Sequence, residues 1–301
     1  MSDLDGVRAL YAQTAPHYET AISPAMDALA RSLAAWMARC VRENAKGSLH
    51  DPFDLPTSGA CPSVRLAFDV GTGSGVLARR MAGFARQVIG VDLSAPMLAA
   101  GQTALHRERS TNVRLVLGDV QRLPFRAAAF DLIGASFGLN HSVPRRSLRE
   151  LVRLLRPNCL LCCQEWGGRD ELSRLFGETL RAYTDSVEVA APPALNAYLE
   201  APCVWQTHLQ DADDYYTTFK AAGFALVWAQ EAAFTTVRFP TVDAFIAYKL
   251  GWVTRRLRYE ALSEAARTAC YADLRAVLAP HCAPDGALLW QPPLIRVCAV
   301  R

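Results

Sequence analysis

The stretch Phe68-Asp69-Val70-Gly71-Thr72-Gly73-Ser74-Gly75 decides the fold predicted for this chain of 301 residues. The apolar run 64–70 predicts a buried strand, and the helical periodicity of 75–85 places the glycines in the turn that follows it. Glycine suits this turn because it adopts positive φ and lets a backbone approach a ligand without a Cβ. The free N–H groups at the start of the helix favour an anionic group. We therefore predict a ligand site at the end of this strand, with a turn that binds nothing as the alternative.

Strand-like and helix-like segments alternate through the middle of the chain. The predicted strands are 64–70, 87–91, 113–117, 130–135 and 160–166, and the predicted helices are 75–85, 95–108 and 144–155. Short apolar strands that alternate with helices indicate βαβ units, a parallel sheet and right-handed crossovers. The predicted fold class is therefore α/β, doubly wound and mostly parallel.

Candidate ligand-binding residues follow the next three predicted strands. Asp92 follows the second strand, where a carboxylate can accept hydrogen bonds from both hydroxyls of a ribose. Asp119 follows the third strand and can accept from an exocyclic adenine amine, while a turn at 135–141 follows the fourth. Ligands of open α/β sheets bind outside the carboxyl ends of the strands, and all of these segments fall there.

Together these residues resemble the class I S-adenosylmethionine methyltransferases, and look most like the branch with the ubiquinone/menaquinone C-methyltransferases and many small-molecule enzymes. Phe68–Gly75 matches the family's first motif, Asp92 its ribose acid and Asp119 its adenine acid. Glu150–Pro157 matches a further motif, although Asn158 stands where the family usually has Gly. Because Asn tolerates the left-handed conformation, we expect this turn to be kept. The resemblance implies a Rossmann-like, seven-stranded, mostly parallel sheet.

The resemblance also implies a cofactor, S-adenosyl-L-methionine, with S-adenosyl-L-homocysteine as its product. The N-terminal segment Tyr11–Tyr18 matches a family segment that folds over the cofactor as a lid, although the two tyrosines equally suit packing on one helix face. The residues expected to bind the cofactor are Tyr11, Tyr18, Asp69, Gly71, Thr72, Gly73, Gly75, Asp92, Leu93, Met97, Gly118, Asp119, Val120 and Ser136.

The rest of the chain is larger than a minimal fold of this type requires, and we expect its helical parts to cover the acceptor site. The predicted organisation is a helical lid at 1–46, a loop or linker at 47–63, the cofactor-binding core at 64–169, a helical cap insertion at 170–210, a continuation of the core at 211–240, a second helical cap insertion at 241–283 and the final core strand at 284–301.

Several histidines and tryptophans are candidates for the acceptor pocket. His141 follows the fourth strand and is the first candidate general base, since its unperturbed pKa of about 6.5 suits proton acceptance near neutrality. The alternative is a histidine at a helix start that bonds the local backbone. Trp166 ends the fifth strand and suits either stacking on a planar acceptor or packing at the core edge. The residues expected in the pocket are His17, His141, Trp166, Trp205 and His208.

Composition favours a globular enzyme of small molecules. The formal net charge is +3, so no strong field favours nucleic acid or an anionic membrane. The N-terminus lacks the pattern of a secretory signal, and no apolar stretch approaches the length of a membrane span. We expect a cytoplasmic protein with a small-molecule acceptor, no nucleic-acid partner and no membrane insertion, and we leave open whether it forms a homodimer.

The cysteines suggest neither a disulfide framework nor a metal site. There are 9 of them, an odd number that is scattered over the chain. Cys159 and Cys162 have the spacing of a metal-binding pair, but they lie in the apolar run 159–163, and no second pair stands at zinc-ribbon spacing. We expect free thiols in the core and no bound metal.

Three functions fit these observations. The first is methyl transfer to oxygen, carbon or nitrogen of a bulky, partly apolar small molecule. The second is an RNA or protein methyltransferase, which the near-neutral charge disfavours. The third is a protein that binds S-adenosylmethionine without methylating anything, and cofactor residues alone do not separate it from the first.

Overall fold

The structure is a computed structural model that describes residues 4–57, 64–191, 195 and 204–301. The described helices are α1 (Leu4–His17), the π-helical turn η1 (Tyr18–Ile22), α2 (Ser23–Ala45), α3 (Val76–Met81), α4 (Ala95–Arg107), α5 (Pro144–Leu154), α6 (Glu171–Thr184), α8 (Val204–His208), α9 (Ala212–Ala222), α10 (Val242–Gly251), α11 (Val253–Glu260), α12 (Glu264–Leu278) and the 3-10 turn η2 (Ala279–His281). The described strands are β1 (Val64–Val70), β2 (Ala85–Asp92), β3 (Val113–Leu117), β4 (Phe130–Ser136), β5 (Leu155–Trp166), β6 (Leu226–Ala232), β7 (Val237–Phe239), β8 (Leu288–Trp290) and β9 (Leu294–Val300).

The main sheet has seven strands in the order β3-β2-β1-β4-β5-β9-β6. The pairs among β3, β2, β1, β4 and β5 are parallel, and β9 runs antiparallel to both β5 and β6. This confirms the predicted α/β class and the mostly parallel, Rossmann-like sheet. The strand order reverses between β1 and β4, and such a switch point is where ligands bind in doubly wound sheets.

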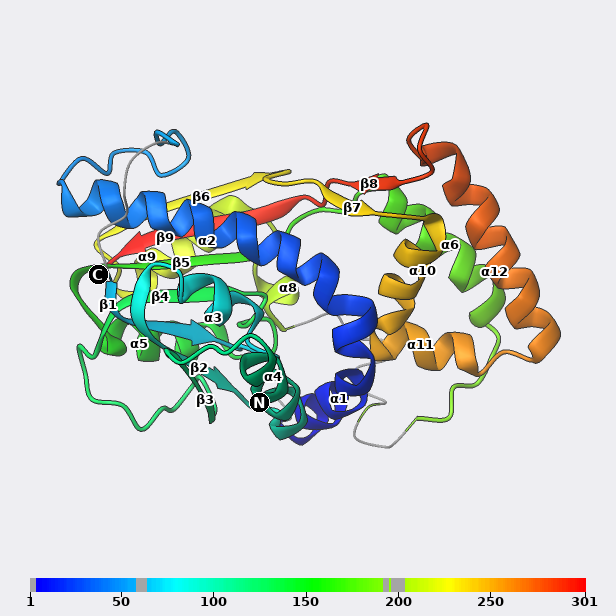
Figure 1. The fold of residues 1–301 in the computed structure, drawn as a ribbon, viewed down its shortest axis with the longest axis horizontal. Coiled ribbons are helices and arrows are strands. Elements are labelled where there is room, and N and C mark those ends of the chain that lie inside the picture. Colours follow the sequence, from blue (N-terminus) through cyan, green and yellow to red (C-terminus); the bar gives the residue numbers. More distant parts are fainter. Residues whose placement is uncertain (1–3, 58–63, 192–194, 196–203) are drawn as a thin grey trace.

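Helices cover both faces of this sheet and bury one apolar cluster on each. The long helix α2 runs across one face beside α3, while α5, α8 and α9 pack on the other (Figure 1). Alternation along β5 supplies both clusters, since Cys162 belongs to the first and its neighbours Leu161 and Cys163 belong to the second. The fully buried Leu33 lies on the core face of α2.

Local signals in the sequence define the ends of several helices and turns. The Ser94 hydroxyl accepts from Met97 N at the start of α4, and Gly223 ends α9 with a φ of +108°. Asn158 has a φ of +61°, so it keeps the left-handed turn in place of the usual glycine. The Glu150 carboxylate accepts from Leu123 N, and this bond joins α5 to the loop before β4.

The C-terminal part differs from its predicted boundaries. Helices α6, α10, α11 and α12 gather with β7 and β8 at one end of the molecule (Figure 1). The predicted core continuation at 211–240 contains β6, which lies in the main sheet, and β7, which pairs with β8 in a separate two-stranded sheet. Within the helical cap insertion expected at 241–283, the chain breaks between α10 and α11 at Trp252, whose ψ of 126° is extended. Strand periodicity alone does not tell which sheet a strand joins.

The predicted cap at 170–210 does not behave as one unit. Its first helix, α6, packs against α12 at the end of the molecule where α10 and α11 also lie. The fully buried Trp205 of α8 instead packs against Tyr215 and Phe219 on the sheet side, and its indole N–H donates to the Ser142 hydroxyl at 3.1 Å. The expected positions 192–194 and 196–203 of this cap, 58–63 of the linker and 1–3 of the lid lie outside the described residues.

We predict that Leu33→Ala lowers the free energy of unfolding by about 2–5 kcal/mol, because it removes a fully buried side chain and leaves a cavity under α2. The matched control is Leu226→Ala on β6, where the leucine is 50% exposed, and its cost should stay below about 1 kcal/mol. Urea denaturation followed by tryptophan fluorescence measures both. Equal losses would show that α2 does not anchor the core.

Candidate functional site

The turn after β1 is shaped by glycines that no other residue replaces without strain. Gly71, Gly73 and Gly75 have φ values of +61°, +54° and +78°. A Cβ on Gly71 would lie 2.4 Å from the Cα of Gly138, in the turn after β4. The backbones at the ends of β1 and β4 therefore touch, and they form the floor of a cavity at the switch point.

Asp92 is held at the end of β2 by two backbone amides. Gly73 N donates to one carboxylate oxygen at 2.7 Å and Ser94 N donates to the other at 2.8 Å. Burial raises the pKa of Asp92, whereas these amides oppose the shift because they favour the ionised form. Each oxygen keeps a lone pair, so the carboxylate can still accept from two ligand hydroxyls.

Asp69 is a buried acid beneath the glycine turn. The Thr72 hydroxyl donates to its carboxylate at 2.6 Å. Burial raises the pKa of Asp69 to about 7, repulsion from Asp92 adds to the rise, and the Thr72 hydrogen bond opposes it. The carboxyl therefore changes charge within the neutral pH range.

Asp119 follows β3 and is oriented by Gln121. The Gln121 backbone N–H donates to Asp119 Oδ1 at 2.9 Å, and its side-chain amide donates to the same oxygen at 3.3 Å. The backbone N–H of Gly118 donates to the Asp92 carbonyl at 2.9 Å, which ties the ends of β2 and β3 together.

A first cavity of about 120 Å³ lies over these strand ends. All the residues predicted to bind the cofactor line it except Gly75, which instead is the N-cap residue of α3. Leu4, Val7 and Tyr11 of α1 and Tyr18 of η1 also line it, so the N-terminal helix forms part of its wall. This cavity fits S-adenosylmethionine. Its carboxylates can accept hydrogen bonds from hydroxyls and an amine, its glycine turn admits a ligand close to the backbone, and one of its walls is apolar.

A second cavity of about 420 Å³ adjoins the first. Tyr11, Phe137, His141 and Trp252 line both cavities, so the two share a wall. The second is rich in aromatic side chains, and the Trp166 ring stacks on Phe137 with 4.0 Å between ring centroids. Its volume falls within the range of small-molecule pockets.

His141 lies at the boundary between the cavities. Its ring meets Tyr11 edge-on, with 5.6 Å between centroids. Burial lowers the pKa of His141 to about 4, so the imidazole is neutral near pH 7 and has a nitrogen lone pair to offer.

The other expected pocket residues lie elsewhere. His17 is exposed at the end of α1, and His208 is exposed at the end of α8. Trp205 belongs to the apolar core, where its indole N–H donates to the Ser142 hydroxyl. None of the three lines either cavity, while Trp166 and His141 do.

Sequence reasoning missed Lys249 and Arg255, which both line the second cavity. Lys249 is only 3% exposed, and it sits in the otherwise apolar run 245–250 of α10. The chain has 3 lysines in all, so a lysine within such a run was the available signal. Trp290, Asp170 and Ser173 also line this cavity and were not predicted to do so.

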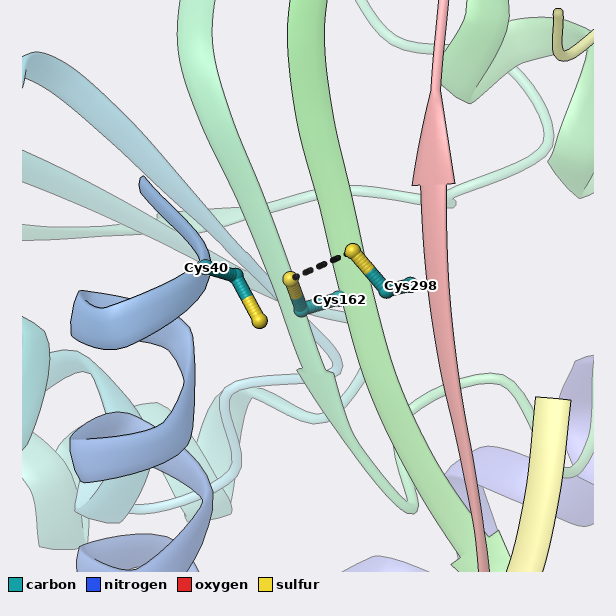
Figure 2. A group of neighbouring side chains, drawn as sticks. All are labelled: Cys40, Cys162 and Cys298. Atoms are coloured by element: carbon teal, nitrogen blue, oxygen red, sulfur yellow. Dashed lines mark hydrogen bonds between the residues drawn. The ribbon is translucent and has the colours of Figure 1, made fainter. Parts of the chain in front are cut away.

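Three cysteines meet in the core under α2. Figure 2 shows the side chains of Cys40, Cys162 and Cys298 pointing toward one another, and their sulfurs lie within 4.8 Å of each other. Cys162 and Cys298 are cross-strand partners of β5 and β9 with 3.9 Å between sulfurs. Hydrogen bonding to the neighbouring thiols, together with burial, raises the pKa of Cys162 well above its usual range. Metal binding requires deprotonated thiols, and the raised pKa of Cys162 disfavours this form. The expectation of no bound metal stays a prediction.

Comparison with known proteins identifies the domain. Residues 68–163 match the family described as methyltransferase domain. The chain contains a class I S-adenosylmethionine-dependent methyltransferase domain. This domain includes the glycine turn, Asp92, Asp119 and the turn after β4, so the predicted family resemblance and cofactor are confirmed.

Curated relatives belong to the expected branch. The chain is similar to demethylmenaquinone methyltransferase of Lactiplantibacillus plantarum, with 31% identity over 49% of this chain and 64% of that protein. It is also similar to ubiquinone/menaquinone biosynthesis C-methyltransferase UbiE of Stutzerimonas stutzeri, with 30% identity over 45% and 54%. The matched region thus spans between about half and two thirds of these relatives.

A solved structure shows the same fold. The YcgJ protein of Bacillus subtilis has a TM-score of 0.50 at 16% identity, with 80% of this chain and 93% of that chain covered.

Within the described residues, no helix has both the length and the apolar character needed to cross a membrane.

We predict that affinity for S-adenosylmethionine rises from pH about 5.5 and levels off above the pKa of Asp69, about 7. The reason is that ionised Asp69 attracts a ligand with sulfonium and ammonium charges, whereas the protonated form does not. Titration calorimetry across this range measures the effect, and Asp69→Asn should flatten the curve. An unchanged slope in the variant would assign the titration to another group.

The stability of the free protein should depend on pH in the opposite sense. The folded pKa of about 7 exceeds the ordinary 3.8, so the folded state binds the Asp69 proton more tightly. That contribution is complete below pH about 4 and is lost as the pH rises to about 7, and Asp69→Asn should remove this part of the melting-temperature profile.

We predict that Gly71→Ala lowers both stability and cofactor affinity, since its Cβ meets the Gly138 backbone and its φ is positive. The expected cost is about 1–3 kcal/mol in unfolding free energy. Gly177→Ala is the control, because the nearest atom to its Cβ is the mobile end of Arg181 at 3.5 Å. Thermal unfolding and S-adenosylmethionine titration report both effects, and a Gly71→Ala protein that binds normally would refute the close-contact argument.

Proposed function

We propose that this protein transfers a methyl group from S-adenosylmethionine to oxygen, carbon or nitrogen of a bulky, partly apolar small molecule. The observation that carries the proposal is the shared wall between the two cavities, formed by Tyr11, Phe137, His141 and Trp252. A cofactor site that opens beside a separate, larger aromatic cavity suits transfer between two bound molecules. A protein that only binds the cofactor has no need for the second cavity.

The residues of the first cavity would hold the cofactor. Asp92 and Asp119 present carboxylates already oriented by backbone amides, and the glycine turn admits a ligand close to the backbone. When bound, the cofactor supplies a methyl group activated by its sulfonium. The fixed positions of these groups favour reaction because orientation replaces much of the entropic cost of bringing two molecules together.

The second cavity would orient the acceptor. Trp166 stacks on Phe137, and Trp290 lies near Trp166 with 5.9 Å between ring centroids, so flat apolar surfaces face a planar substrate. Tyr11 from α1 and Trp252 between α10 and α11 reach the boundary from two different elements. Closure of these elements over the site would exclude water.

His141 is the proposed proton acceptor. Its neutral imidazole can take a proton from an acceptor hydroxyl or from a carbon that becomes acidic during transfer. A pKa of about 4 makes it a weak base, so the gain should come from its position at the boundary rather than from basicity.

Binding of S-adenosylmethionine tests the shared premise. Titration calorimetry should show binding to the unaltered protein and at least about tenfold weaker binding to Asp92→Ala. Incubation with methyl-labelled cofactor then separates the reactions. Label in a small organic product from a metabolite extract supports the proposal, whereas label only in RNA or protein, or no transfer at all, would refute it.

We predict that His141→Ala lowers turnover by about 10²-fold, as expected for loss of a general base. His17→Ala is the matched control, because His17 is exposed and lines neither cavity. Turnover is measured at saturating cofactor as the rate at which the labelled product forms. Equal rates for both variants and the unaltered protein would remove His141 from the mechanism.

A further inference from the structure

We propose that the acceptor carries a carboxylate, which Lys249 and Arg255 bind on the α10–α11 wall of the second cavity. The acceptor class is therefore a planar, aromatic acid rather than a neutral ring. The inference rests on the proposed function, because it assigns a substrate class to the same cavity.

Lys249 is the first observation. Its side chain is 3% exposed and lines the second cavity. Its ammonium lies 4.4 Å from the ring centroid of Trp290 and 5.0 Å from that of Phe245. It donates to the Ser173 hydroxyl at 2.6 Å, and an ammonium has three protons to donate. A lysine held this deep is costly unless something in the cavity pairs with it.

Arg255 is the second observation. It lines the same cavity from the first turn of α11, and within the described residues its guanidinium has no hydrogen bond or ion pair. Burial lowers the pKa of Lys249 well below its usual range, and repulsion from Arg255 lowers it further. Two neighbouring cations that disfavour each other are stabilised together by one anion between or beside them.

The one acid of the described lining offsets these charges only in part, because Asp170 interacts with both Lys249 and Arg255. Among the described residues, Asp170 is the one carboxylate in the lining. Both of its oxygens serve the start of α6, because Oδ1 accepts from Ser173 N at 2.9 Å and Oδ2 accepts from the Ser173 hydroxyl at 2.6 Å. The Ser173 hydroxyl thus accepts from Lys249 and donates to Asp170, which fixes the ammonium in position. Arg169 adds a further cation at the rim.

The geometry selects a carboxylate on a ring. A guanidinium offers a planar fork that matches carboxylate geometry, and an ammonium adds a point charge. Stacked Trp166 and Phe137 supply flat apolar surfaces in the same cavity. An acid without a ring would leave these surfaces unused, and a neutral ring would leave two buried cations to share Asp170, the one carboxylate among the described lining residues.

The test compares two probes that differ in charge. Binding of 3-hydroxy-2-naphthoate and of 3-hydroxy-2-naphthamide is measured by titration calorimetry with saturating S-adenosylhomocysteine. We expect the acid to bind at least about tenfold more tightly than the amide. Lys249→Met and Arg255→Gln should each reduce this preference to near unity. Lys220→Met, an exposed lysine on α9 that lines neither cavity, should leave it unchanged.

The melting temperature separates carboxylate binding from a structural role for Lys249. If Lys249 binds the acceptor, replacing this buried charge among aromatic rings by methionine should leave the melting temperature unchanged or raise it, while the preference for the acid is lost. If Lys249→Met melts lower and keeps the preference, or if acid and amide bind the unaltered protein equally, the inference is overturned. Affinity for S-adenosylhomocysteine is measured on the same samples. Failure of that binding would count against the proposed function, whereas normal binding with equal probe affinities would count against the carboxylate alone.

Discussion

The site depends on the direct backbone contact between the ends of β1 and β4. A Cβ on Gly138 would lie 1.9 Å from the Val70 carbonyl oxygen, so only glycine permits the approach. The contact brings the end of β1, where Asp69 lies, beside the turn that leads to His141. Phe137, within the second turn, has a φ of +59°, an unfavourable conformation for a bulky residue. This strained conformation places the Phe137 ring on Trp166 and in the wall that the two cavities share.

The two cavities have opposite charge. Acids line the first, where Asp92 and Asp119 stand at strand ends, while Lys249 and Arg255 line the second. Opposite fields separated by aromatic side chains suit a cationic donor and an anionic acceptor that must not exchange places.

The parts that were predictable from sequence are those with local physical causes. The five parallel strands, the positive φ of Gly71 and Asn158, and the Ser94 cap follow from periodicity and turn chemistry over a few residues. Positions set by long-range packing were not accessible. Trp205 has the composition of a pocket residue, but its indole N–H finds Ser142 and its ring packs in the core.

The acceptor cavity illustrates the same limit. Its wall joins α1, the end of β5, the α10–α11 corner and the loop before β9, which are far apart in the chain. No periodic pattern places Tyr11 and Trp252 in the same cavity wall, so this depends on how α1, α10 and α11 pack against the sheet. Lys249 was missed because its helix otherwise resembles an ordinary core element.

The position of β9 between β5 and β6 has a consequence for biosynthesis. Residues 294–300 leave the ribosome after every other described strand and helix. Until then β5 presents an unpaired edge, and β6, which is hydrogen-bonded to β9 alone in the described sheet, has no place to dock. The nascent chain can thus assemble its parallel half early, but the edge of β5 must stay unpaired without aggregating until β9 is inserted.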